Sequence, residues 1–91
     1  MSSRILRLPA AQEYSGLKRS TIYLRIAEGL FPQPIPLGPN SNKKSAIVGW
    51  PERELAALNE ARIRGAGDEE IRGLVKNLVA ERKSAVAKAA A

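Results

Sequence analysis

The sequence has no cysteine and no histidine among its 91 residues, and its only aromatic residues are two tyrosines, one phenylalanine and one tryptophan. Without cysteine the chain has no disulfide scaffold and no thiolate nucleophile, which fits a reducing cytoplasm. Without either residue it lacks the ligands of most zinc sites and the imidazole group that serves much acid–base catalysis. These absences exclude several classes of enzyme and metalloprotein, and they predict that the chain holds no metal and no cofactor.

Long apolar runs are also missing from the chain. No stretch approaches the roughly 20 residues that a membrane-spanning helix needs, and the N-terminus has no signal-peptide core. There is no Walker-type glycine loop, and the clustered acids stand where helices are predicted to begin rather than as catalytic pairs. The sequence therefore predicts a soluble cytoplasmic protein that is not an enzyme and has no membrane partner.

The positive charge is concentrated in the first half of the chain. The whole sequence carries 15 lysine and arginine residues against nine aspartate and glutamate residues, a formal net charge of +6. Residues 1–50 hold seven basic and two acidic residues, so five of the six excess charges lie there. A basic field confined to one half favours a polyanionic partner that docks on that half, and the absence of a large apolar moment favours nucleic acid over a membrane.

The segment 17–32 has the pattern of a short helix with one apolar face. Ile22 and Ile26 lie one turn apart, and Gly29 is placed to end the helix in a left-handed conformation. The opposite face contains no acid and consists of Lys18, Arg19, Ser20, Thr21, Tyr23 and Arg25. An ordinary solvated helix has a similar pattern, but a cationic, hydroxyl-bearing face is also typical of a helix that lies in a DNA groove.

Residues 8–16 predict another short helix before it, with Pro9 in the first turn, where its missing N–H is no loss. The predicted inward residues of this helix are Leu8, Ala11 and Tyr14. Two short helices joined by a turn that contains Gly16 form a helix-turn-helix, whose second helix usually reads DNA. Residues 1–7 are predicted to form a flexible arm.

Residues 31–50 differ from the helical segments in composition, because they are rich in proline and in residues that favour β-strands. Prolines at 32, 34 and 36 exclude a helix, residues 39–45 form a polar loop, and residues 46–50 predict a strand. The result is a β-hairpin whose tip carries Lys43 and Lys44, either as a soluble tip or as a wing that contacts the DNA backbone. The residues predicted to lean on the helices are Ile35, Leu37, Val48 and Trp50.

The C-terminal part predicts two further helices. The first begins at Pro51 with Glu52 and Glu54 in its first turn, and its inner face is Leu55, Leu58 and Ala61. A glycine-rich break at 65–67 separates it from a helix over 68–83, whose apolar stripe is Ile71, Leu74, Val75, Leu78 and Val79. That stripe suits packing on its own domain or pairing with a second copy, and the segment after residue 83 is expected to fray.

The runs R-I-L-R-L-P-A-A-Q-E-Y-S-G-L-K-R-S-T-I-Y, E-G-L-F-P, P-L-G and V-G-W-P-E-R-E-L resemble those of the AlpA-type prophage regulators. These regulators belong to a wider group of small winged helix-turn-helix proteins that includes excisionases. The resemblance covers roughly residues 4–64 and implies a mainly α fold with a small β-hairpin, a winged helix-turn-helix of the MerR/excisionase-like type. The predicted domain division is therefore 1–64 for DNA binding and 65–91 for a C-terminal amphipathic helix and tail.

Carried over by position, the resemblance implies DNA contacts by the polar face of the second helix and by the 39–45 loop. The chain departs from the family at Lys18, where relatives commonly have Ser or Thr. Those residues can cap the start of a helix with a side-chain oxygen, and lysine cannot. Its 39–45 loop is also longer than the short wing usual in relatives, and the C-terminal helix lies outside the characteristic motifs.

The leading hypothesis is a sequence-specific double-stranded DNA-binding protein of a prophage or integrative element, located at the bacterial nucleoid. It would act as a transcription regulator, as an excisionase (a recombination directionality factor), or as both. Predicted partners are DNA, further copies of the chain on DNA, and an integrase or RNA polymerase. A protein–protein adaptor that uses the C-terminal helix is the alternative, whereas RNA binding is disfavoured because no aromatics alternate with basic residues on a sheet.

Overall fold

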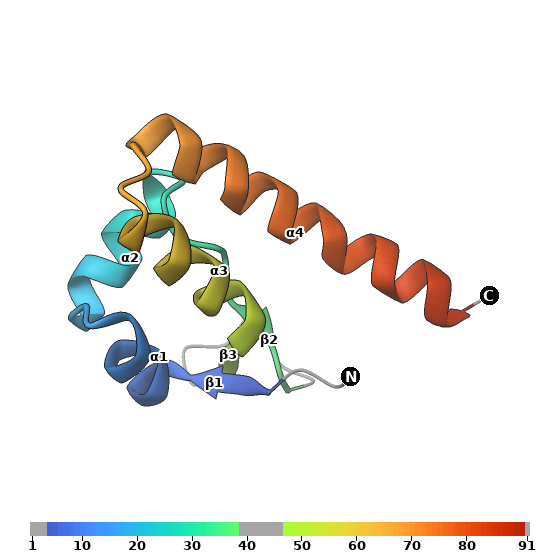
Figure 1. Cartoon of the computed structure of the whole chain (residues 1–91). Helices are drawn as coiled ribbons and strands as arrows, with labels where there is room; N and C mark the ends of the chain where they lie inside the picture. Colours follow the sequence, from blue (N-terminus) through green and yellow to red (C-terminus); the bar gives the residue numbers. More distant parts are fainter. Residues whose placement is uncertain (1–3, 39–46, 91) are drawn as a thin grey trace.

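The computed structural model describes residues 4–38 and 47–90, which form four helices and three short strands (Figure 1). In chain order the elements are β1 (Ile5–Arg7), α1 (Leu8–Ser15), α2 (Arg19–Ala27), β2 (Ile35–Pro36), β3 (Val48–Pro51), α3 (Glu52–Ile63) and α4 (Asp68–Ala90). The predicted mainly helical class with a small β component is confirmed. The proposed wing residues Lys43 and Lys44 lie outside the described residues.

The sheet has three antiparallel strands in the order β1-β3-β2. Ile35 pairs with Gly49, which confirms the predicted pairing of the two hairpin strands. The prediction of a flexible arm over residues 1–7 is wrong for its second half, because Ile5–Arg7 pairs with β3 and places Leu6 opposite Trp50. Leu6 is only 3% exposed between two exposed neighbours, which is the alternation of a strand with one buried face.

Helices α1 and α2 lie close to their predicted boundaries. Pro9 lies in the first turn of α1, and Gly16 ends the helix in a left-handed conformation with φ of 74°. Ala11 is fully buried as predicted, but Tyr14 is 38% exposed, so its predicted inward position is wrong. Three residues advance a helix by about 300°, which turns Tyr14 roughly 60° away from the direction of Ala11.

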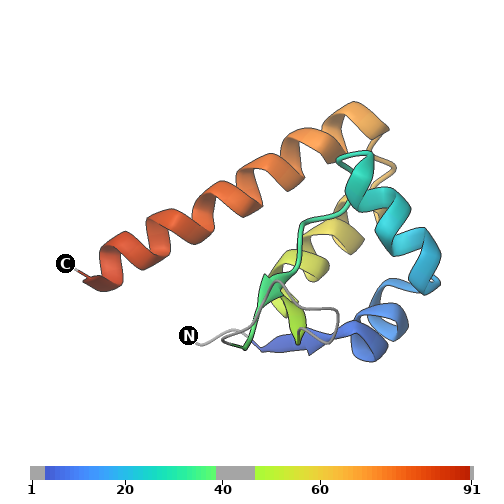
Figure 2. The ribbon, with the colours of Figure 1, turned by 180° about the vertical axis from the view of Figure 1, so that it is seen from behind.

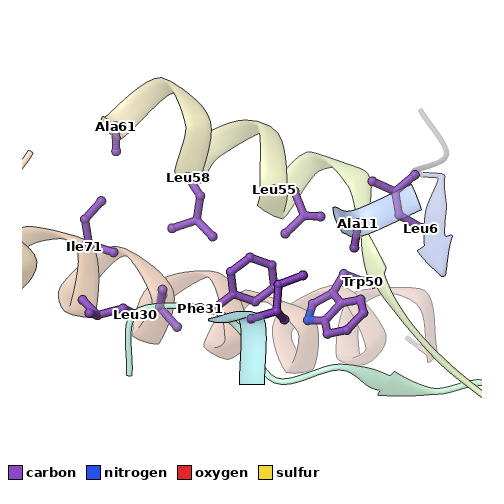
Figure 3. Packing of buried hydrophobic residues seen from close by; sticks show 11 residues of the cluster. Leu6, Ala11, Leu30, Phe31, Trp50, Leu55, Leu58, Ala61 and Ile71 are labelled. Atoms are coloured by element: carbon purple, nitrogen blue, oxygen red, sulfur yellow. The ribbon is translucent and has the colours of Figure 1, made fainter. Parts of the chain in front are cut away.

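The core lies where the helices meet the sheet (Figure 3). The Phe31 and Trp50 rings pack edge to face with centroids 5.7 Å apart, and the Trp50 indole N–H donates a 2.7 Å hydrogen bond to the Pro32 carbonyl. Leu55, Leu58 and Ala61 of α3 point into this core, as predicted. Leu37 is 42% exposed, so its predicted contact with the helices is wrong. Ile35 pairs with Gly49, and Gly49 faces the side of the sheet opposite to its neighbour Trp50. Leu37, two residues after Ile35, is therefore also on the side away from Trp50.

Helix α4 is the longest of the described elements, and it runs past α3 toward the C-terminus (Figures 1 and 2). Its first turns pack on its own chain. Ile71 is fully buried and Val75 is 8% exposed in the common core, while Leu74 and Val79 pack against it. The stripe therefore packs on its own domain, which is one of the two arrangements its pattern suits. Helix α4 continues to Ala90, past the predicted end at residue 83, and the expected fraying of this segment stays a prediction.

Candidate nucleic-acid interface

The turn between α1 and α2 fixes how α2 is presented. The Ser15 hydroxyl donates to the Ala11 carbonyl at 2.7 Å and accepts from the Leu17 amide at 3.3 Å, which stabilises the turn together with Gly16. Helix α2 then begins after Lys18, whose extended backbone occupies the N-cap position without a capping side-chain hydrogen bond. That finding confirms the expected effect of lysine at this position, since its side chain has no acceptor for the free amides.

The inward face of α2 holds the helix against the core. Ile22 is fully buried, and Ile26 is partly buried against the same cluster. At the other end Gly29 adopts a φ of 77°, and the Leu30 amide donates a 2.8 Å hydrogen bond to the Arg25 carbonyl. This left-handed ending of the helix is as predicted, and it turns the chain so that Leu30 and Phe31 enter the core.

Of the residues predicted to contact DNA, Arg19, Ser20 and Tyr23 are exposed on α2, and Lys18 is exposed at its N-cap. Thr21 and Arg25 are half-buried along the side of the helix. The Arg19 guanidinium lies 6.0 Å from the centroid of the Tyr23 ring, one helical turn further on. A cation over an aromatic face is attracted by the ring quadrupole, so Tyr23 restricts where Arg19 can reach. The two side chains thus lie together on the surface.

Among the described residues, none of the acidic side chains forms an ion pair with a basic residue of α2. Within the described ranges 4–38 and 47–90, the ion pairs are Arg4 with Glu52, Arg72 with Glu69, and Arg82 with Glu54. None of these pairs includes a basic residue of α2. A group of exposed positive charges that the protein does not neutralise is suited to contacts with the phosphates of a polyanion.

Arg25 occupies a different position from the other predicted contacts. It lines a small cavity of about 50 Å³ at the junction of α1, α2 and α3, together with Arg62 and Asn59. Asn59 donates a 3.1 Å hydrogen bond to the Tyr14 carbonyl and ties α3 to the end of α1. Arg25 therefore lies on the flank of α2 and not on its outward face.

Sequence reasoning missed one residue of this surface. Leu24 is 57% exposed, the highest exposure of any large apolar residue in α2, and Ala27 is also exposed on the same side. The signal was present in the sequence, because position 24 lies about 200° around the helix from the buried Ile22. The outward face of α2 therefore has an apolar centre and polar edges.

Membrane-spanning helices and metal clusters are both absent from the part of the chain that the structure describes. Among those residues, none of the helices is both long and apolar enough to cross a bilayer. The same residues contain no cluster of three or more acidic, histidine or cysteine side chains arranged to hold a metal ion.

Known proteins are similar to most of the chain. A family model described as "Prophage CP4-57 regulatory protein (AlpA)" matches residues 4–62, which include all of β1 through β3 and nearly all of α3. The "Uncharacterized protein ORF88" of Enterobacteria phage P4 is 39% identical over 62 residues, a region that covers 68% of this chain. The chain spans 64% of the length of that relative. No solved structure gives a significant match.

Proposed function

Because the chain belongs to the AlpA family of prophage regulatory proteins, we propose that it binds double-stranded DNA in a sequence-specific manner through α2. The observation that carries this proposal is the outward face of α2, where exposed basic and hydroxyl side chains have no internal counter-charge among the described residues. A helix of nine residues held by its isoleucine face leaves that outward face free to enter a major groove.

We assign the roles from side-chain chemistry and position. Arg19, ordered by Tyr23, donates to a guanine edge, while Tyr23 also packs on sugar or phosphate. Lys18, Ser20 and Thr21 contact phosphates near the start of the helix. Arg25 contacts a flanking phosphate from the side of α2. The loop with Lys43 and Lys44 acts as the wing of a winged helix-turn-helix and contacts the backbone beside the groove.

The proposal is tested with two variants, one that removes a positive charge from α2 and one that removes a positive charge from α3. We expect Arg19→Ala to weaken specific binding by about 1–3 kcal/mol, with folding unchanged because Arg19 is exposed. Arg53→Ala is the matched control, since it removes the same charge from the exposed side of α3. Both variants are titrated against duplexes selected from a random library and against random duplex. Equal losses in the two variants would disprove the assignment of α2 as the reading helix.

We further propose that the protein acts as a transcription regulator, as an excisionase, or as both, at the bacterial nucleoid. The support is the regulatory description of the family and the small, basic character of the chain. A promoter reporter and an excision assay with an integrase of the same element separate the two roles. RNA polymerase and integrase are the corresponding protein partners.

Binding by two or more copies is also proposed. One small domain makes few base contacts, and neighbouring copies on DNA would extend the recognised sequence. The apolar stripe of α4 does not support this idea by itself, because Ile71 and Val75 are already buried in their own chain. The adaptor alternative is weakened for the same reason. A binding titration that gives a Hill coefficient of one on every selected duplex would contradict cooperative binding.

A further inference from the structure

Leu24 stands at the centre of the outward face of α2. It is 57% exposed, and its neighbours along the helix surface are Ser20 one turn before and Ala27 just under one turn after. Both neighbours are small, so an approaching surface can reach the leucine closely. Tyr23 lies beside it and is 41% exposed, with Arg19 stacked near the ring. Leu24 is thus the first apolar group that a molecule docking on α2 would meet.

An exposed leucine is common on protein surfaces and needs no special role in general. The position of Leu24 makes it different from a scattered apolar residue. Its side chain makes no contribution to the core, and a lysine or glutamate would serve helix formation almost equally well. It also stands between polar side chains, on the side of the helix turned away from the buried Ile22.

Resting on the proposed DNA binding by α2, we propose that Leu24 determines specificity by packing against the C5-methyl group of a thymine. That methyl is the only apolar group that a base pair presents in the major groove. Leucine has no donor or acceptor, so at a G·C pair it would cover polar base edges without pairing them, which is unfavourable. Leu24 therefore selects an A·T pair at one position of the bound sequence.

Thymine-to-deoxyuridine replacement tests this inference, because it removes the methyl group and keeps the hydrogen-bonding edges. Duplexes are first selected with the unchanged full-length chain, and each thymine is then replaced singly. We expect one replacement to weaken binding by about fourfold, the effect of removing one methyl-sized group from an apolar contact. In Leu24→Ala the same replacement should have no effect, whereas Leu24→Met should retain most of the effect.

Ile63→Ala is the matched control, since Ile63 is 78% exposed on α3 and lies outside α2. This variant should keep the full effect of the replacement. If no duplex is enriched over random sequence, the proposed DNA binding fails and the role of Leu24 fails with it. If duplexes are enriched but Leu24→Ala responds to every replacement as the unchanged chain does, the role of Leu24 alone is overturned.

Discussion

Gly49 of β3 pairs with Arg7 of β1 on one side and with Ile35 of β2 on the other, and it has no room for a side chain. A Cβ atom built there would lie 2.6 Å from Ile5 Cγ2, 3.0 Å from the Leu6 carbonyl oxygen and 3.1 Å from Leu37 Cδ1. One of these atoms belongs to the backbone of the paired strand, so it cannot move without disturbing the β1–β3 pairing. The backbone φ of Gly49 is not positive, so glycine is not needed for its conformational freedom. It is needed because the neighbouring strands approach closely.

We therefore expect Gly49→Ala to destabilise the protein by about 1–3 kcal/mol, the usual cost of overpacking. The measurement is urea unfolding of the full chain. Gly73→Ala is the control, because a Cβ at Gly73 would meet nothing within 4 Å inside helix α4. There alanine should stabilise by about 0.5–1 kcal/mol through its better helix propensity. A neutral Gly49→Ala would show that the strands separate easily.

The structural roles of single residues were predictable where they depend on nearby sequence. Ile22 follows from helical spacing, and the left-handed Gly29 follows from its place after an apolar turn. Gly49 was not predictable in this way, because its close neighbours Ile5 and Leu37 are brought to it by strand pairing. The proposed DNA-contacting residues, such as Arg19, also follow from local pattern. The position of the Arg19 guanidinium over the Tyr23 ring does not follow from spacing alone.

At the scale of elements, one ion pair connects the far part of α4 to the rest of the fold. Arg82 Nε donates a 2.8 Å hydrogen bond to Glu54 Oε2, and Arg82 Nη2 donates to the other carboxylate oxygen and to the Gln33 carbonyl. The Glu54 side chain is 1% exposed and that of Arg82 is 19% exposed. A single guanidinium therefore joins α4 to the first turn of α3 and to the segment before β2.

Removal of this guanidinium should leave a buried carboxylate without a partner. We expect Arg82→Ala to lower the free energy of unfolding by about 3 kcal/mol, and the double change of Glu54→Leu with Arg82→Leu to recover most of the loss. Denaturant unfolding of both variants measures the two effects.

Arg72→Ala provides the comparison for this ion pair. The partner Glu69 is 93% exposed, so its pair with Arg72 is screened by water, although Arg72 Nε also donates to the Glu28 carbonyl. The expected loss is about 1 kcal/mol or less. An Arg82→Ala variant no less stable than Arg72→Ala would mean that the buried pair contributes little.

Element prediction from sequence succeeded for helices and failed where an element depends on distant partners. The four helices were predictable from apolar periodicity, from Pro9 in a first turn and from the glycines that follow helix ends. Strand β1 was missed because three residues carry little pattern, and only pairing with β3 makes them a strand. Glu54 was recognised as an acid in the first turn of a helix, but its partner lies 28 residues away, beyond any local signal.

At the scale of the whole molecule, α4 completes the core rather than forming an appendage. Ile71 is fully buried, and it belongs to the same cluster as Leu30 and as Leu58 and Ala61 of α3 (Figure 3). The division of the chain after residue 64 into a DNA-binding part and a C-terminal part stays a prediction. The apolar core, by contrast, includes side chains from both sides of residues 65–67.

Loss of this packing should be visible without DNA. We expect Ile71→Ala in the full chain to cost about 2–5 kcal/mol, because it removes a fully buried aliphatic group. A chain that ends at Arg64 loses Ile71 and Val75 together and should show no cooperative unfolding transition. Circular dichroism during thermal unfolding measures both. A truncated chain with an unchanged transition would show that α4 is dispensable for folding.

The distribution of charge leads to a prediction about the salt dependence of DNA binding. Seven basic and two acidic residues lie in the first half of the chain, and Lys43 and Lys44 supply two of those seven cations. If each lysine binds a phosphate, replacing both by alanine should weaken specific and random-duplex binding by similar factors. It should also flatten the slope of log K against log salt by about 0.9 for each phosphate that is no longer neutralised, since fewer counterions are released.

Replacement of Arg64 and Lys76 by alanine removes the same charge from two exposed positions near and within α4, and it should leave that slope nearly unchanged. The comparison separates a local phosphate contact from a general loss of positive field, which falls off within about 10 Å at 0.1 M salt. Equal slopes in the two double variants would contradict the wing contact. In that case the loop would be a solubilising tip, and the specific affinity would have to come from α2 and its flanks.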